Sequence, residues 1–129
     1  MVTWKKEREE KAIQKFRKTQ KEGFPMIHNP ILRGFHPDPS IIRAGTDYYI
    51  ATSTFEWWPG VRIHHSRDLV HWSLIGYPLT RMSQMDLRGV GPSQGIWAPC
   101  LIYDNGVFYL VYTIVKAFYC NMYDTENYL

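Results

Sequence analysis

Two stretches of the chain, 60 residues apart, repeat the same order of local signals. In each, a proline opens a short apolar segment, a turn follows, and a second apolar segment comes after the turn. The first copy runs from Pro39 through 40–42, 45–47 and 48–53, and the second from Pro99 through 100–102, 104–106 and 108–113. A repeat of this length, with about four short strands per unit, fits one blade of a β-propeller. Two unrelated hairpins would share part of the pattern, but the correspondence has no gap, which favours repetition.

Turn-forming residues divide both units into short strands. The expected strands cover 40–44, 47–53, 61–66 and 72–77 in the first unit, and 99–103 and 107–115 in the second, with a further strand beginning near Asn127. Residues 78–95 are interpreted as a long loop, and loops of this length in compact domains are usually functional. The predicted fold class is therefore all-β, a partial β-propeller of roughly one to two blades.

The central strands of both units are apolar on both faces. Residues 107–112 include no charged side chain, and residues 48–53 alternate apolar and small side chains without a polar face. Strands of this kind lie between stacked layers, and fewer than two blades cannot cover them. We expect exposed hydrophobic surface and unpaired strand edges, which favour self-association.

A carboxylate held between two prolines precedes the first strand. Pro37 has a fixed φ, and a residue before proline is disfavoured in the helical region, so the sequence predicts an extended backbone at Asp38. Asp38 is either a positioned acid or an ordinary turn residue, because Pro-Asp-Pro is also good turn chemistry.

The Asp38 motif is followed by three more motifs in a defined order. The four read DPSII (38–42), DYYIATSTFEW (47–57), PGVRIHHSRDL (59–69) and GIWAP (95–99). Together they resemble the family 43 glycoside hydrolases, most closely the β-xylosidases of that family, from about Asn29 to Leu129. The resemblance implies a five-bladed β-propeller with an acidic pocket at its axis. It identifies residues 25–129 as the amino-terminal part of the catalytic domain, preceded by a basic, helical extension at 1–24.

The resemblance also implies an activity and a site. The activity is inverting hydrolysis of xylosides or arabinosides of plant cell-wall xylan, of the β-xylosidase or α-arabinofuranosidase type, with a xylo- or arabino-oligosaccharide as substrate and no cofactor. Asp38 takes the place of the general base. Phe55 and Trp97 help to wall the sugar pocket, since the CH face of a sugar packs well on an aromatic ring; packing in the core is a nearly equal alternative for both. Trp57 and Trp58 either pack a turn or form an aromatic rim for a second sugar.

Inverting hydrolysis requires two carboxyl groups about 6.5–9.5 Å apart, one to deprotonate a water and one to protonate the leaving oxygen. In the family the general acid is a glutamate and a further aspartate tunes it; both lie in later blades, which would follow Leu129. The remaining acidic residues considered as substitutes have plain structural interpretations, mostly as turn residues: Asp47, Asp68, Asp86, Asp104 and Glu56.

Two functional hypotheses follow. The first is a truncated glycosidase that is inactive alone, with a complementing carboxy-terminal fragment or a second copy as its candidate protein partner. The second is a non-catalytic remnant or carbohydrate-binding module. Two departures from the family pattern bear on both: Ile114 stands where the family typically has an aspartate, expected near the pocket, and residues 117–122 match loosely.

The first 22 residues differ in composition from the rest. They contain eight Lys or Arg and four Glu, so their net charge is +4. Because the whole chain has a net charge of +3, the other residues together carry a net charge of −1. Residues 4–21 are rich in helix formers and lack Pro and Gly, which predicts a helix that stops at Gly23. This helix is solvated or loosely docked, or it contacts lipid or nucleic acid. Because the basic charge belongs to the extension alone, no nucleic-acid partner is predicted for the chain as a whole.

The sequence contains neither the apolar core of a signal peptide nor a span long enough to cross a bilayer, so we expect a cytoplasmic location without a membrane partner. Cys100 is expected in the core and Cys120 in a less regular segment, and the pair forms no disulfide framework or metal site. His64 and His65 are consecutive on a predicted strand and point to opposite faces, so no metal site is predicted there either.

Overall fold

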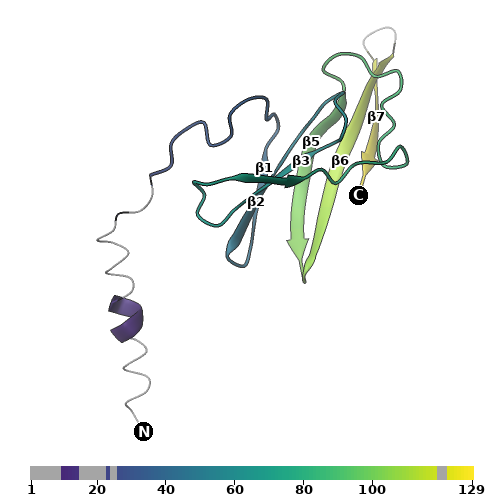
Figure 1. Ribbon diagram of the computed structural model, residues 1–129. Helices are drawn as coiled ribbons and strands as arrows, with labels where there is room; N and C mark the ends of the chain where they lie inside the picture. The colour runs from purple at the N-terminus through teal and green to yellow at the C-terminus, as the bar shows by residue number, and fades with distance from the viewer. Residues whose placement is uncertain (1–9, 15–22, 24–25, 119–121) are drawn as a thin grey trace.

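A computed structural model describes residues 10–14, 23, 26–118 and 122–129 (Figure 1). Apart from a helical turn at 10–14, its regular structure consists of strands in two antiparallel sheets, which confirms the all-β class. The strands are β1 (Ser40–Ala44), β2 (Asp47–Thr52), β3 (Arg62–Ser66), β4 (Ser73–Gly76), β5 (Gly95–Asp104), β6 (Val107–Phe118) and β7 (Met122–Tyr128).

The first sheet contains β1 to β4 in sequence order, each paired antiparallel with the next. This is the four-stranded unit that the turn residues predict, and every strand begins and ends within one residue of its expected bounds. Gly45 has a φ of +63° in the turn between Ala44 and Asp47, which are paired. Glycine adopts this angle without steric cost, so the β1–β2 turn is tight.

The second sheet has the order β5–β6–β7 and is also antiparallel. Asn105 and Gly106, at φ values of 47° and 86°, form the two-residue turn between β5 and β6, as Asn-Gly favours. The expectation of a strand beginning near Asn127 was wrong, because β7 begins at Met122. Residues 123–127 are mostly polar, but their backbone pairs with β6, and pairing context overrides the weak strand propensity of the side chains.

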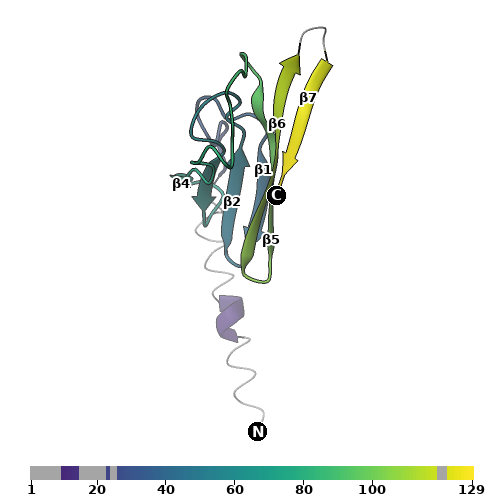
Figure 2. The ribbon, with the colours of Figure 1, turned by 90° about the vertical axis from the view of Figure 1, so that its right-hand side faces the viewer.

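The two sheets pack against each other along β1, β2 and β5 (Figure 2). Their buried side chains form one core, made of Ala51, Val61, Leu79, Met85, Ile96, Leu101, Tyr112 and Ile114. Leu79 and Met85 come from residues 77–94, which contain no regular strand. The loop was predicted over 78–95, but β5 begins at Gly95, four residues before its predicted start. Leu79 exchanges two backbone hydrogen bonds with Gly60 (2.9 and 3.3 Å), and the Tyr112 hydroxyl donates to the Gln84 carbonyl (2.5 Å). The predicted loop therefore closes the core instead of only crossing a face.

Two predicted environments were wrong. Ile114 is 1% exposed in the core, paired with Ile96, and it lines none of the hollows described below. Cys100 is exposed, because side chains alternate along β5 and Leu101 takes the core-facing position. Cys120 lies outside the described residues.

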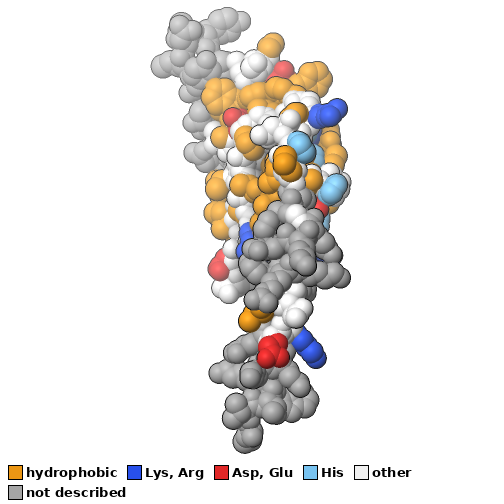
Figure 3. Space-filling model, turned by 90° about the vertical axis from the view of Figure 1, so that its left-hand side faces the viewer, with side chains coloured by type: hydrophobic (Ala, Val, Ile, Leu, Met, Phe, Trp, Pro, Cys, Tyr) orange, Lys and Arg blue, Asp and Glu red, His pale blue; other side chains and the backbone are white. Residues whose placement is uncertain are grey.

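Hydrophobic side chains are exposed on the outer faces of both sheets, as predicted. Ile41 and Leu74 are 55% and 48% exposed on the first sheet, and Ile102 and Tyr109 are 44% and 42% exposed on the second. Figure 3 shows hydrophobic side chains spread over one side of the strand region. Within the described part of the chain, β1, β4, β5 and β7 each have a paired neighbour on one edge only. Both features favour association with further polypeptide.

The predicted helix at 4–21 is described only over residues 10–14, which are helical with exposed side chains; the other residues of that prediction lie outside the described ranges. No helix in the described part of the chain has the length and hydrophobicity needed to cross a membrane.

Met85→Ala is expected to lower the free energy of unfolding of the purified chain by about 2–5 kcal/mol, because the fully buried side chain would leave a cavity. Met82, in the same loop, is 52% exposed, so Met82→Ala is the matched control and should change the value by less than about 0.5 kcal/mol. Urea denaturation followed by tryptophan fluorescence measures both. Equal losses in the two variants would contradict a core role for this loop.

Candidate functional site

Asp38 lies where the segment before β1 meets both sheets. The Ser53 amide donates to the Pro37 carbonyl (3.0 Å) and so ties the preceding backbone to the end of β2. The Asp38 carboxylate then accepts a hydrogen bond from the Ala98 amide in β5 (3.3 Å). The predicted extended backbone was wrong: Asp38 has a φ of +50°, an angle that Asp tolerates better than most residues. The hydrogen bonds to the Pro37 carbonyl and to the Asp38 carboxylate override the local preference for an extended backbone.

Asp38 faces a hollow of about 330 Å³ whose other lining residues are Phe55, Ser93, Trp97 and Ala98. The structure therefore brings the three predicted site residues, Asp38, Phe55 and Trp97, around one hollow. Four of the five lining residues, all except Trp97, have a positive φ: 50° at Asp38, 49° at Phe55, 62° at Ser93 and 29° at Ala98. Such angles are uncommon outside glycine, and residues that adopt them cluster at functional sites.

A β-bulge lies in β5 at the edge of this hollow. Trp97 is opposite Thr113 and Cys100 is opposite Val111, so β5 has one residue more than β6 between these pairs. Bulges change the direction of side chains and are frequent next to active sites. Pro99 is the sequence signal for this irregularity, because proline cannot donate to the ladder.

An isolated backbone bridge joins the turn that carries Phe55 to the start of β5. The Phe55 amide donates to the Ile96 carbonyl (3.1 Å), and the Ile96 amide donates to the Phe55 carbonyl (2.9 Å). The Ser53 hydroxyl adds a third hydrogen bond to the Ile96 carbonyl (3.0 Å). Gly95 has a φ of +89°, and a Cβ at this position would overlap the Phe55 carbonyl. Only glycine allows the two backbones to approach this closely.

Aromatic rings form one wall of the hollow. Phe55 and Trp97 meet nearly edge to face, with ring centroids 6.5 Å apart and an interplanar angle of 77°, and Phe35 lies 5.5 Å from Phe55. Trp97 is 37% exposed, and its Nε1–H donates to the Ser93 carbonyl (3.0 Å). Trp97 is therefore not a residue of the buried core, whereas Phe55 is half-buried.

Sequence reasoning missed Ser93, Ala98 and Phe35. Ser93 and Ala98 reach the hollow through backbone angles that no residue pattern predicts. The available signal was the pair of glycines at 91 and 95, which mark tight turns around Ser93.

A second hollow of about 330 Å³ is lined by Phe35, Trp57 and Arg62. Because Phe35 packs on Phe55, the two hollows have adjoining aromatic walls. Trp57 and Trp58 are 63% and 47% exposed, and Trp57 lines this second hollow.

Asp47 is engaged in an ion-pair cluster away from the hollow. It accepts hydrogen bonds from His65 (2.6 Å) and Arg67 (3.0 Å). These bonds, His65 first, lower the pKa of Asp47 to about 2. A general acid must be protonated near the working pH, so a lowered pKa argues against that role for Asp47.

Asp68 and Asp86 are engaged in the same way. Hydrogen bonds from His71 hold the pKa of Asp68 well below its usual range, and hydrogen bonds from Arg88 do the same for the pKa of Asp86. Neither carboxyl lines the hollow of Asp38. Asp104 accepts from its neighbour Asn105 in the β5–β6 turn (3.2 Å), as a turn residue does.

A larger hollow of about 520 Å³ beside β6 is lined by no Asp or Glu side chain. A smaller one of about 230 Å³ between the sheets is lined by apolar and tyrosine side chains. Neither offers an acidic side chain, whereas the hollow at Asp38 does, so the hollow at Asp38 is the candidate functional site.

Gly95→Ala is expected to destabilise the chain more than Gly106→Ala. Both glycines have a similar positive φ (89° and 86°), but an added Cβ meets the Phe55 backbone at Gly95 and nothing within 4 Å at Gly106. Strain at such an angle costs on the order of 1 kcal/mol in both variants, and the backbone overlap adds to it at Gly95 alone. Urea denaturation measures the difference, and equal destabilisation would contradict the close approach at Phe55.

The model of Glycosyl hydrolases family 43 matches residues 27–128. The xylosidase/arabinosidase 43B of Humicola insolens is 62% identical over 105 residues, which are 81% of this chain and 20% of that protein. The β-xylosidase of Bacillus subtilis (strain 168) is 60% identical over 103 residues, which are 80% of this chain and 19% of that protein. The chain thus spans about a fifth of the length of these relatives.

A solved structure gives the same result. The crystal structure of xylan β-1,4-xylosidase from Bacillus halodurans C-125 matches with a TM-score of 0.77 and 65% identity, over 80% of this chain and 20% of that chain. The residues matched by the family model include both sheets and all five residues that line the hollow at Asp38. On this evidence the chain belongs to family 43 of the glycosyl hydrolases.

Proposed function

We propose that this chain supplies the general base and part of the sugar-binding wall of a glycoside hydrolase that acts on xylosides or arabinosides of plant cell-wall xylan. The observation that carries this proposal is the hollow shared by Asp38, Phe55 and Trp97, whose lining has a positive φ at four of five residues. The names of the relatives, a xylosidase/arabinosidase and two β-xylosidases, support the substrate class.

In this mechanism Asp38 removes a proton from a water molecule. The water attacks the anomeric carbon from the face opposite the leaving oxygen, and the configuration of that carbon is inverted. The Ala98 amide donates to Oδ2 of Asp38 (3.3 Å), which orients the carboxylate and leaves Oδ1 to accept the proton. Phe55 and Trp97 present apolar ring surface to the CH groups of the sugar.

A second carboxyl group must protonate the leaving oxygen from about 6.5–9.5 Å away. Among the described residues, Asp38 is the only acid that lines the hollow, and Asp47, Asp68 and Asp86 are held ionised by their partners. In this proposal the general acid therefore lies outside the described residues, in further polypeptide, and the chain alone is expected not to turn over substrate.

The two sheets are, in this proposal, the first blades of a five-bladed β-propeller formed by residues 25–129 and further polypeptide, with residues 1–24 as an extension. The 60-residue repeat, the four-stranded first sheet and the exposed hydrophobic outer faces support it. The polypeptide that covers these faces is either a complementing carboxy-terminal fragment or a second copy of the chain.

A non-catalytic remnant or carbohydrate-binding module is the second candidate function. It is favoured by the single carboxylate in the hollow, because an aromatic wall with one acid is sufficient to bind a sugar but not to hydrolyse its glycosidic bond by inversion.

The purified chain is expected to release no measurable nitrophenol from a nitrophenyl xyloside or arabinoside, because one carboxylate cannot serve as both base and acid. Mixing with a carboxy-terminal fragment of a family member is expected to restore release. Activity of the chain alone that disappears in Asp38→Ala would contradict this expectation and would also exclude the non-catalytic alternative.

A chimera tests Asp38 directly. Residues 27–128 would replace the matching segment of the Bacillus subtilis β-xylosidase, to which the chain is 60% identical. Asp38→Asn in the chimera should lower kcat for nitrophenyl xyloside by about 10²–10⁴-fold, because the amide keeps the shape of the side chain but cannot accept the proton.

Asp86→Asn is the matched control, since Asp86 pairs with Arg88 outside the hollow, and it should leave kcat nearly unchanged. Full activity of the Asp38→Asn chimera would exclude Asp38 as the base. A chimera that binds xylo-oligosaccharide but hydrolyses none at any pH would favour the non-catalytic alternative.

A further inference from the structure

Trp97 is held by two successive hydrogen bonds that begin at Glu56. The Glu56 carboxylate accepts from the Ser93 amide (3.1 Å), and the Ser93 carbonyl accepts from Nε1–H of Trp97 (3.0 Å). Both Ser93 groups belong to the backbone, so the connection does not depend on the serine hydroxyl. The connection thus joins the Glu56 carboxylate to the Trp97 indole through the backbone of Ser93.

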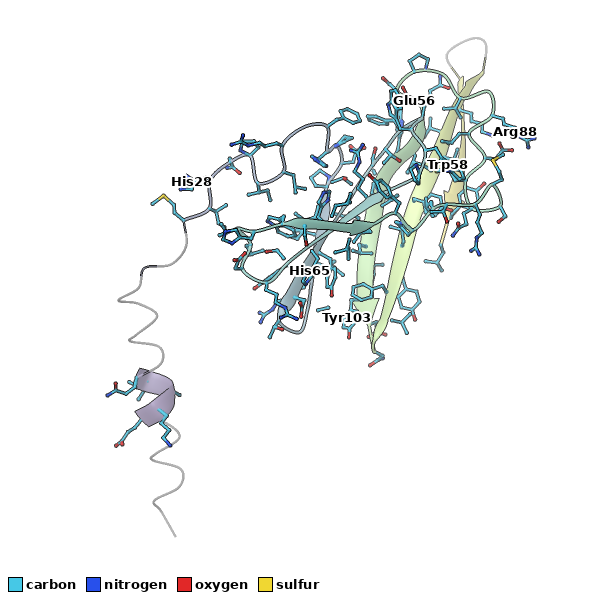
Figure 4. All side chains as sticks on the ribbon, viewed as in Figure 1. His28, Glu56, Trp58, His65, Arg88 and Tyr103 are labelled. Atoms are coloured by element: carbon cyan, nitrogen blue, oxygen red, sulfur yellow. The ribbon has the colours of Figure 1, made fainter. Side chains whose placement is uncertain are left out.

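Glu56 does not line the hollow at Asp38. It lies at the upper end of the two sheets in Figure 4, at the opposite end from Tyr103. It belongs to the turn closed by the Trp57 amide, which donates to the Thr54 carbonyl (2.9 Å). The same turn carries Phe55, so it supplies one aromatic wall residue directly and holds the other through Ser93.

The backbone of Ser93 requires support from its surroundings. Its φ of 62° lies in a region that non-glycine residues populate sparsely and keep only when neighbouring contacts fix it. The turn around it is closed by Gln94, whose amide donates to the Gly91 carbonyl (3.2 Å) and whose Oε1 accepts from the Gly91 amide (2.9 Å). The two Gln94–Gly91 hydrogen bonds are local to this turn, whereas the bond from the Ser93 amide to Glu56 joins it to the turn that carries Phe55. The negative charge of Glu56 strengthens that bond.

We propose that Glu56 is a positioning residue for Trp97: by holding the Ser93 amide, its carboxylate fixes the orientation of the indole that walls the hollow at Asp38. Glu56 touches no substrate and transfers no proton; it acts through Ser93. The consequence for catalysis rests on the proposed function, whereas the consequence for the indole concerns this chain alone.

The first experiment reads the indole directly. The 129-residue chain is labelled with 5-fluorotryptophan, and the ¹⁹F resonance of Trp97 is assigned with Trp97→Phe. Glu56→Ala removes the acceptor and should shift or broaden that resonance. Glu56→Gln keeps a carbonyl oxygen that accepts from the Ser93 amide, so it should restore the wild-type resonance.

Trp72 is the internal reference, because its Nε1–H donates to the Leu69 carbonyl (3.1 Å) and it does not line the hollow. Its resonance should stay in place in both variants. Glu10→Ala is the matched control, since it removes an exposed carboxylate from the helical turn at 10–14 and should move neither resonance.

The second experiment reads function in the Bacillus subtilis chimera. Glu56→Ala should lower kcat/KM for nitrophenyl xyloside by about 10–100-fold, because a displaced wall residue misplaces the sugar relative to the base. Glu56→Gln should recover most of this loss, because Gln keeps the acceptor for the Ser93 amide. If Glu56 acted only through its negative charge, Glu56→Gln would lose as much activity as Glu56→Ala.

The proposal would be overturned if the Trp97 resonance were unchanged in Glu56→Ala. It would also be overturned if Glu56→Gln shifted that resonance as far as Glu56→Ala does. If Glu56→Ala also loses the Trp72 resonance through unfolding, Glu56→Met, which keeps the length of the side chain without a strong acceptor, decides by the same criteria. A wild-type chimera without activity would count against the proposed function, while the ¹⁹F spectra would still decide the role of Glu56.

Discussion

The pair of backbone hydrogen bonds between Phe55 and Ile96 is the constraint on which the candidate site depends. Phe55 follows β2 of the first sheet and Trp97 belongs to β5 of the second, and this pair (3.1 and 2.9 Å) joins the backbone of Phe55 directly to the residue before Trp97. The approach is possible because Gly95 has no side chain to meet the Phe55 carbonyl. The Asp38–Ala98 hydrogen bond then crosses between the sheets at the same hollow and adds the carboxylate.

The strands of the first sheet could be predicted from the sequence because turn residues separate them. Gly45 closes the β1–β2 turn, and Asn105 with Gly106 closes the β5–β6 turn. The first residue of β7 could not be predicted, because its polar residues pair with β6 through the backbone. The burial of Ile114 and the exposure of Cys100 were also missed, because the side-chain direction on an apolar strand depends on which face the other sheet covers.

The site was predictable in part for a related reason. Asp38, Phe55 and Trp97 lie in motifs, and their residue types suit a sugar site. Ser93 and Ala98 reach the hollow only through positive φ angles and a β-bulge, and these arise from long-range contacts that local preferences do not encode. The backbone of Asp38 shows the same limit: the proline rule predicted an extended residue, and the hydrogen bonds around it produced a left-handed one.

Polar side chains are buried on the outer face of the first sheet. His36, His64 and Thr52 each have a buried side-chain atom without a hydrogen-bond partner among the described residues: Nδ1 of both histidines and Oγ1 of the threonine. Burial, with the nearby charges of His36 and Arg62, lowers the pKa of His64, so this face disfavours a charged imidazole.

The chemistry of the hollow gives a physical reason why the proposed activity needs further polypeptide. Asp47, Asp68 and Asp86 are held ionised by hydrogen-bonded partners away from the hollow, and Glu56 is committed to the Ser93 amide, which leaves Asp38 as the acid that faces the hollow among the described residues. One carboxylate can accept a proton from water but cannot also donate one to the leaving oxygen across the sugar ring. Polypeptide that covers the apolar outer faces would also be the natural source of the second carboxyl group. In the proposed function, covering these faces and supplying the second carboxyl group are therefore expected to depend on the same polypeptide, because the exposed apolar faces and the hollow at Asp38 belong to the same two sheets.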